Sequence, residues 1–87
     1  MNDDIAHIVV AMTAELRDLR GRSDYVANAR RDHLYEQLRL VGMTAAFFGG
    51  YGAMKRLHDA AEDLVGNTNE VGYIINRAWD MVGGWLA

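Results

Sequence analysis

Two histidines stand near carboxylates at helical spacing, an arrangement that has the donor types of a metal site. His33 precedes Glu36 by three residues, and His58 precedes Glu62 by four. Di-iron helical bundles, however, use a Glu-x-x-His order and add glutamates from two further helices. The order is reversed here and those additional glutamates are missing. A hydrophilic helix face with i,i+4 pairs explains the same residues, so we expect no metal and no cofactor.

The residue types that nucleophilic catalysis requires are scarce. The chain has no Cys, and its single Ser, Ser23, precedes a predicted helix, where a serine is better used as the N-cap. The Gly-rich run at 49–52 has no predicted strand before it, so it fails the context of a phosphate-binding loop. We therefore predict a protein that is not an enzyme.

Arginines gather between the first predicted helix and the start of the second. Asp18, Asp24 and Asp32 are interleaved with them, and mixed signs are typical of a solvated, ion-paired face. The net charge of −3 also argues against a general nucleic-acid binder. A nucleic-acid or nucleotide binder using this cluster stays an alternative function. The candidate patch for an anionic partner consists of Arg17, Arg20, Arg22, Arg30 and Arg31.

These residues must be positioned by helices. Apolar residues recur at alternating spacings of four and three, which is the pattern of bundle and coiled-coil helices, and the chain contains no Pro. The pattern predicts helices over 3–20, 24–48, 53–65 and 69–82, with a break at the glycines of 49–52, since each Gly costs an exposed helix about 1 kcal/mol. We expect an all-α single domain of three to four helices, arranged as an antiparallel bundle or a helical hairpin.

The uncharged segment 40–54 is the strongest candidate for close helix contact. Small residues recur every fourth position along it, and such a stripe lets two helix backbones approach closely. The segment is shorter than the roughly 20 residues that span a membrane, so a small membrane-associated, holin-like protein is the second choice. Trp is enriched at binding hot spots, which adds the two C-terminal tryptophans. The predicted interface is Ala45, Ala46, Gly49, Gly50, Ala53, Trp79 and Trp85.

Size and composition together predict self-association. A core built from 87 residues supplies only about 3–5 kcal/mol, and without Cys no disulfide can add to it. Because 51% of the residues are apolar, we expect a homodimer or larger assembly that also binds a larger protein. Small phage and mobile-element inhibitors of host complexes, anti-CRISPR proteins among them, share this size and character, although no motif identifies such a family. The acidic N-terminus lacks a secretory signal, so we expect a cytoplasmic protein.

Overall fold

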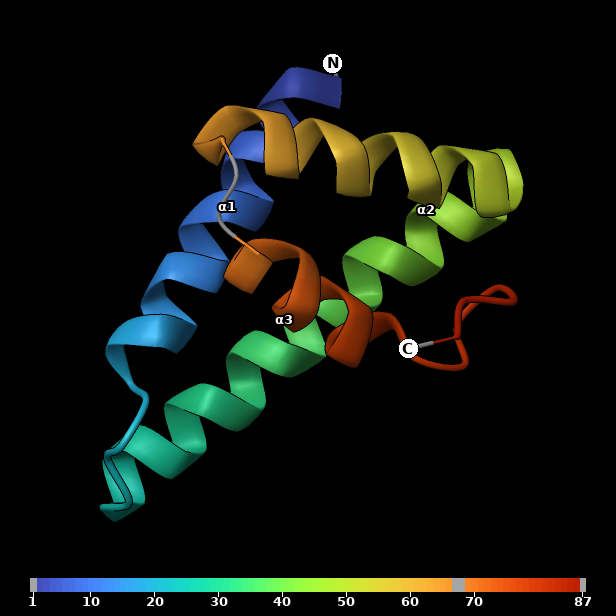
Figure 1. The fold of residues 1–87 in the computed structure, drawn as a ribbon. Helices are drawn as coiled ribbons and strands as arrows, with labels where there is room; N and C mark the ends of the chain where they lie inside the picture. Colours follow the sequence, from blue (N-terminus) through green and yellow to red (C-terminus); the bar gives the residue numbers. More distant parts are fainter. Residues whose placement is uncertain (1, 67–68, 87) are drawn as a thin grey trace.

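The described residues form three helices. The computed structural model describes residues 2–66 and 69–86, and its helices are α1 (Asn2–Asp18), α2 (Tyr25–Val65) and α3 (Asn69–Trp79) (Figure 1). No strand occurs within those two ranges. The all-α class predicted from the apolar spacing is therefore confirmed.

The turn between α1 and α2 ends in an aspartate cap. The carboxylate of Asp24 accepts a hydrogen bond from the backbone N–H of Ala27 at 3.2 Å, which satisfies one of the amides left free at a helix start. The expectation that Ser23 caps this helix is wrong, because the capping position is one residue later. Arg22 also donates a hydrogen bond to the Asp24 carboxylate. This bond is the main reason that the pKa of Asp24 lies below the ordinary value of an aspartate.

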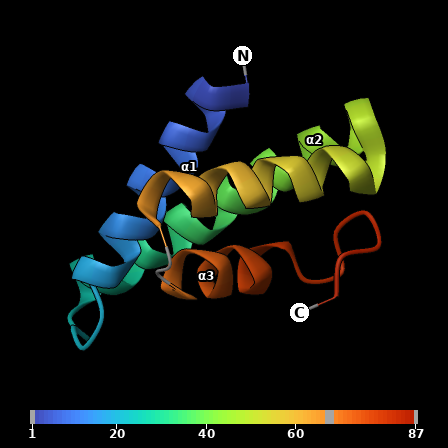
Figure 2. The same cartoon turned by 45° about the horizontal axis from the view of Figure 1, so that its top comes forward.

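Helix α2 is bent at a single residue. Gly50 has φ 68° and ψ −163°, a non-helical conformation that interrupts an otherwise continuous helix. That region of φ/ψ space is essentially restricted to glycine. The predicted gap from 49 to 52 is thus reduced to one position, and Gly49 and Gly52 lie in helix. The bend divides α2 into a first arm (25–49) and a second arm (51–65), and the second arm turns back across the molecule (Figures 1 and 2).

Helix α3 lies between the two arms of α2 in Figure 1 and carries the centre of the core. Trp79 has no solvent exposure, and its indole Nε1 donates a hydrogen bond to the carbonyl oxygen of Leu38 at 2.8 Å. The ring lies directly on the first arm, where a Cβ built on Gly42 would come within 2.6 Å of the indole. The absence of a side chain at Gly42 is therefore what allows α3 to approach the first arm so closely.

The chain after α3 leaves the predicted helical course. We expected this helix to run to residue 82, but it ends at Trp79. Residues 80–86 form a compact turn, in which the Met81 amide donates to the Trp85 carbonyl oxygen at 2.8 Å. Gly83 and Gly84 adopt positive φ there. The turn folds Trp85 back onto the core, with its ring centroid 5.1 Å from that of Trp79.

Candidate functional site

Most of the apolar seams that predicted association are covered inside one subunit. The described core has one contiguous cluster contributed by all three helices and the C-terminal turn. Its largest members that are almost completely removed from solvent are Val9, Leu38, Met54, Val71, Ile75 and Trp79. Self-association is therefore not needed to cover these side chains, and the question becomes which apolar residues remain at the surface.

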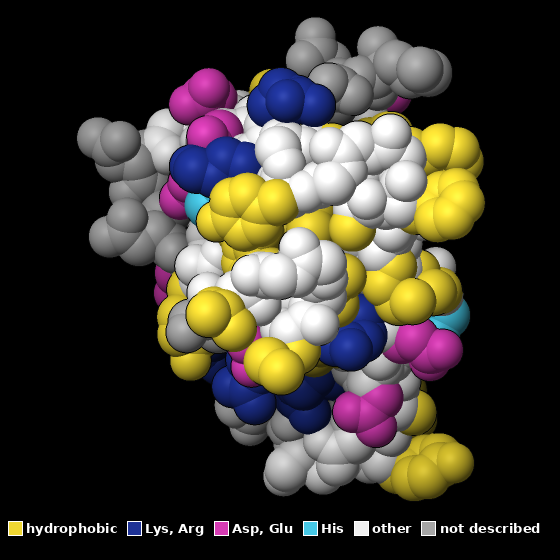
Figure 3. Space-filling model, turned by 90° about the vertical axis from the view of Figure 1, so that its right-hand side faces the viewer, with side chains coloured by type: hydrophobic (Ala, Val, Ile, Leu, Met, Phe, Trp, Pro, Cys, Tyr) yellow, Lys and Arg dark blue, Asp and Glu magenta, His cyan; other side chains and the backbone are white. Residues whose placement is uncertain are grey.

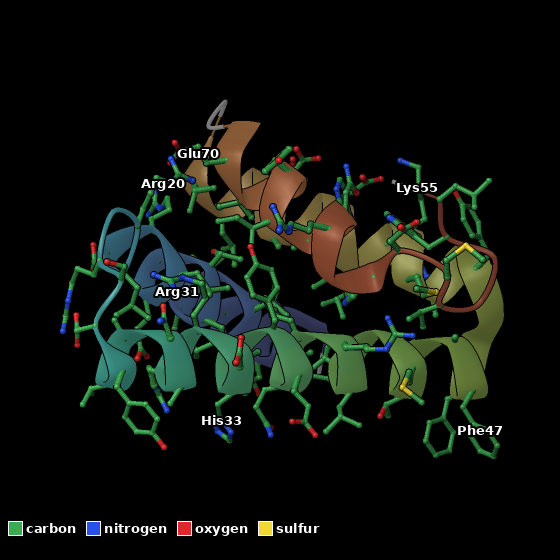
Figure 4. The ribbon with its side chains drawn as sticks, turned by 90° about the horizontal axis from the view of Figure 1, so that it is seen from below. Arg20, Arg31, His33, Phe47, Lys55 and Glu70 are labelled. Atoms are coloured by element: carbon green, nitrogen blue, oxygen red, sulfur yellow. The ribbon has the colours of Figure 1, made fainter. Side chains whose placement is uncertain are left out.

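The residues that remain exposed concentrate around the bend of α2. Phe47 and Phe48 are each 81% exposed, and their rings pack edge to face with centroids 5.0 Å apart. Figure 4 shows Phe47 pointing away from the body of the molecule, and Figure 3 shows hydrophobic side chains at the surface around the bend. We define the elbow face as Ile5, Ile8, Leu40, Met43, Phe47 and Phe48, whose exposed fractions run from 38% to 81%.

A groove of about 560 Å³ opens on the elbow face, between α1 and both arms of α2. Its lining includes Ala45, Gly49 and Ala53, which form one of the small-residue stripes seen in the sequence. Small side chains at these positions leave the space that makes the groove. Of the three, Gly49 is exposed, whereas Ala45 and Ala53 are half-buried, and Ala45 also packs against the core.

The parallel stripe of small residues is used inside the subunit. Gly42 lies under Trp79, and Ala46 lies under the C-terminal turn, where a Cβ on Gly83 would come within 2.7 Å of the Ala46 methyl group. Ala46 is accordingly half-buried, and Gly50, the last residue of this stripe, forms the bend. The predicted interface thus divides into three residues that line an open groove and others that serve the fold.

The two tryptophans of the predicted interface lie in the core. Trp79 is 0% and Trp85 5% exposed, and Trp85 donates from Nε1 to the Asn76 Oδ1 at 3.1 Å. The sequence interpretation placed them at an interface because Trp is enriched at binding hot spots. The turn at 80–86 instead packs Trp85 against Trp79 in the core. Phe47 and Phe48, each 81% exposed, are the aromatic pair at the surface.

Sequence reasoning passed over the two phenylalanines for an identifiable reason. Phe48 follows the four-three apolar spacing after Leu38, Val41 and Ala45, which predicts a seam position, and the spacing predicts no role for Phe47. Successive helical residues point about 100° apart, so Phe47 lies beside the line of positions that Phe48 follows. The exposure of both rings became visible only with the bend at Gly50.

The five predicted arginines do not form one patch. Arg30 pairs with Glu15 through two hydrogen bonds, the Nη2–Oε1 bond measuring 2.9 Å, and so joins the first arm to α1. On another side, Arg17 and Arg20 both approach Glu70 at the start of α3, with Arg20 Nη1 2.7 Å from Oε1. The hydrogen bond from Arg20 lowers the pKa of Glu70, just as Arg30 lowers that of Glu15.

Arg31 has a structural role at the end of α1. Its Nη2 donates to the carbonyl oxygens of Leu19 and Arg22 at 2.8 and 2.6 Å, and its Nη1 donates to Asn28 Oδ1 at 2.7 Å. Cations interact favourably with the carbonyls at a helix C-terminus. Arg31 thereby holds the turn between the first two helices, and its guanidinium lies on the same side of the molecule as Arg20 and Glu70 (Figure 4).

The two histidine–carboxylate pairs predicted from the sequence, one at His33 and one at His58, do not come together in the structure. His58 Nδ1 lies 3.3 Å from Asp59 Oδ1 and 3.3 Å from Glu62 Oε1, all on the second arm. His33 projects to solvent from the first arm and is not part of this group (Figure 4). Lys55 donates to both oxygens of Asp59 at 3.1 Å. Donor atoms of His58, Asp59 and Glu62 all lie within 4.8 Å of one another, and Lys55 adds an i,i+4 ion pair to this face of the helix.

Comparisons of the chain with protein-family models, with curated proteins and with solved structures find no match. Within the described residues, no helix combines the length and the apolar character that crossing a bilayer demands. The apolar segment 40–54 is itself divided by the bend at Gly50.

Proposed function

We propose that this protein is a non-enzymatic helical interaction module that acts as a homo-oligomer through its elbow face. The observation that carries the proposal is the size of that face. At about 200 Å² for each large side chain, the six residues leave roughly 700 Å² of apolar surface in water. The largest apolar patch of a typical monomer is about 300–600 Å², whereas a standard interface takes about 800 Å² from each partner.

The shape of the elbow face suits a second copy of the same chain. A twofold dimer uses the same patch on both subunits, so the patch must be complementary to itself. The elbow face has projecting rings at Phe47 and Phe48 beside a groove lined by Ala45, Gly49 and Ala53. A twofold axis at this face would bring the rings of each copy to the groove of the other.

The charge distribution supports the same arrangement. A charged group near a twofold axis meets its own copy, and like charges in contact across an interface cost several kcal/mol. The segment 40–54 carries no charged residue, and the polar lining of the groove is limited to Gln37, Thr44 and Arg56. Arg56 is the one charged residue in that lining, so a single like-charge contact opposes pairing at the elbow face.

A larger partner protein belongs to the same proposal. The acidic charge, the small size and the lack of a catalytic residue set in the sequence agree with a phage or mobile-element inhibitor that occupies a host complex as a small oligomer. In this narrower role the elbow face assembles the oligomer that engages the host protein.

Sedimentation equilibrium over a hundredfold concentration range tests the proposal. The wild-type chain should reach a dimer or larger species, and the double variant Phe47→Ser, Phe48→Ser should associate about 100-fold more weakly, as expected for the loss of buried aromatic contacts. The matched control is Tyr25→Ser, Val26→Ser, which removes two side chains that are 86% and 69% exposed but lie at the far end of the first arm. Circular dichroism establishes that each variant is folded.

Two results would contradict the proposal. One is a wild-type chain that remains a folded monomer at every concentration. The other is an equal loss of association in the Tyr25 and Val26 control, because that would attribute the effect to general surface hydrophobicity and not to the elbow face.

A further inference from the structure

A second recess lies at the opposite end of the molecule from Phe47, as the labels in Figure 4 show. It is a cleft of about 780 Å³ where the turn after α1, the first arm of α2 and helix α3 meet. We call it the Arg–Tyr cleft, after the side chains that distinguish its lining: Arg20, Arg22, Arg31, Arg77, Tyr35 and Tyr73.

The charge of the Arg–Tyr cleft is opposite to that of the whole chain. Its lining holds four guanidinium groups, and Glu70 is the one carboxylate among its described lining residues. The chain as a whole has a net charge of −3. A concave site with one sign of charge focuses the electrostatic field and raises the local concentration of counter-ions. The local excess of positive charge therefore indicates an anionic ligand.

Two of the four guanidinium groups are held by uncharged groups. The three hydrogen bonds of Arg31 go to two backbone carbonyl oxygens and an amide oxygen, so these bonds orient the cation without cancelling its charge. Arg77 lies over the ring of Tyr35, with Cζ 5.8 Å from the ring centroid. A cation–π contact of this kind positions the guanidinium over the ring.

The other two arginines have partners that an anion can replace. The side chain of Arg20 is 58% exposed while it pairs with Glu70, and exposed pairs contribute little to stability. The Arg22–Asp24 pair is longer, at 3.3 Å, than the usual 2.7–2.9 Å of a charge-assisted hydrogen bond. A phosphate can therefore take donors from both arginines at small cost, and guanidinium groups bind phosphate in a bidentate manner.

The tyrosines add a surface for a planar group. Tyr73 projects from α3 and is 62% exposed, and Tyr35 faces the cleft from the first arm under Arg77. Bases stack on exposed aromatic faces and on guanidinium planes. The cleft thus combines donors for phosphate with a ring on which a base can stack.

We propose that the Arg–Tyr cleft binds a small phosphate-bearing ligand with a planar ring, of the nucleotide class. Its volume lies within the roughly 300–1,000 Å³ of small-molecule sites. A nucleic-acid polymer fits less well, because Asp18, Asp24 and Asp32 alternate with the arginines along the chain and would repel the phosphates that flank the bound one. The proposal does not depend on association through the elbow face, which lies at the other end of the subunit.

Isothermal titration calorimetry of the whole chain, with EDTA present, tests the ligand class. ATP should bind, inorganic tripolyphosphate should bind more weakly because it has no base to stack, and adenosine should give no measurable heat. The absence of ATP binding at millimolar concentration would overturn the proposal. So would tripolyphosphate binding as tightly as ATP, or a single-stranded oligonucleotide binding more tightly than ATP.

Variants locate the site and separate the two parts of the ligand. Arg77→Gln should weaken ATP binding about tenfold or more, as expected for a lost hydrogen bond to a charged group. Tyr73→Ser should weaken ATP binding and leave tripolyphosphate binding unchanged. The control Arg30→Gln makes the same change of charge outside the cleft, at a residue paired with Glu15, and should change the affinity by less than about twofold because salt screens a remote exposed charge. Equal weakening by Arg30→Gln and Arg77→Gln would show a non-specific charge effect and overturn the assignment.

Discussion

Gly42 is the residue on which the packing of α3 depends most directly. A Cβ at this position would lie 2.6 Å from Cδ1 and Nε1 of Trp79, and that indole is buried and bonded to the Leu38 carbonyl. We expect Gly42→Ala to destabilise the protein by about 1–3 kcal/mol, the usual cost of overpacking a core. Chemical denaturation followed by tryptophan fluorescence measures the change.

Gly52 provides the matched control for this substitution. It also lies in α2, but the nearest atom to a Cβ there is the Nη1 of Arg56 at 3.3 Å, the end of a flexible and exposed side chain. Gly52→Ala should therefore stabilise the protein by up to about 1 kcal/mol, through the better helix propensity of alanine. If Gly42→Ala also stabilised the protein, the close contact between Trp79 and the first arm would be wrong.

At the scale of the elements, the bend of α2 is the feature that gives the molecule its shape. Gly50 has φ 68° and ψ −163°, and a Cβ there would meet no atom within 4 Å. The obstacle to a side chain is thus the backbone conformation alone. We expect Gly50→Ala to lower the free energy of unfolding by about 1–3 kcal/mol, the cost of a residue in such a region.

The same denaturation experiment measures the effect at Gly50, and Gly52→Ala, two residues away and helical, again serves as the control. Small-angle X-ray scattering adds a test of shape, because a variant that relieved the strain by straightening α2 would have a larger radius of gyration. A Gly50→Ala variant with both the stability and the dimensions of the wild type would contradict the bend.

Local patterns in the sequence predicted the helices, but they did not predict the direction in which the chain turns between them. The four-three spacing placed Val9, Leu38, Met54 and Ile75 inside, and each is buried, since this pattern is a property of one helix. It could not say in which direction the chain turns at Gly50, because a glycine permits many turns and the packing of the arms selects one. The exposure of Phe48, which the same spacing had placed in the core, follows from that choice.

The candidate sites depended even more on tertiary structure. Arg77, Tyr35 and Tyr73 are distant in sequence from the arginines around residue 20, and only the return of α3 brings them to the same cleft. Arg30, by contrast, stands next to Arg31 in the sequence but turns to Glu15 on α1. Neighbouring residues on a helix point about 100° apart, so an arginine cluster in sequence need not be a cluster in space.

At the scale of the whole molecule, the subunit is compact without a partner. Its radius of gyration is 12.5 Å, close to the roughly 12 Å of a compact domain of this length. The prediction that the chain could not cover its apolar seams alone therefore applies to the elbow face and not to the core. We therefore propose that association adds stability to a subunit whose core is already covered, in distinction from an obligate oligomer that has no folded monomer.

This distinction leads to a prediction for thermal unfolding. If folded subunits pair and unfolded chains do not, mass action stabilises the folded state as the concentration rises. For a chain of this size, a hundredfold increase in concentration should raise the apparent Tm by about 5–10 °C. The Phe47→Ser, Phe48→Ser variant should show a Tm that does not change with concentration, and at low concentration it should unfold within about 2 °C of the wild type, because both rings lie outside the core. Differential scanning calorimetry at several concentrations measures both quantities.

A wild-type Tm independent of concentration would remove the elbow face as a contact surface. A variant that unfolds far below the wild type at every concentration would mean that the two rings belong to the fold of the single subunit.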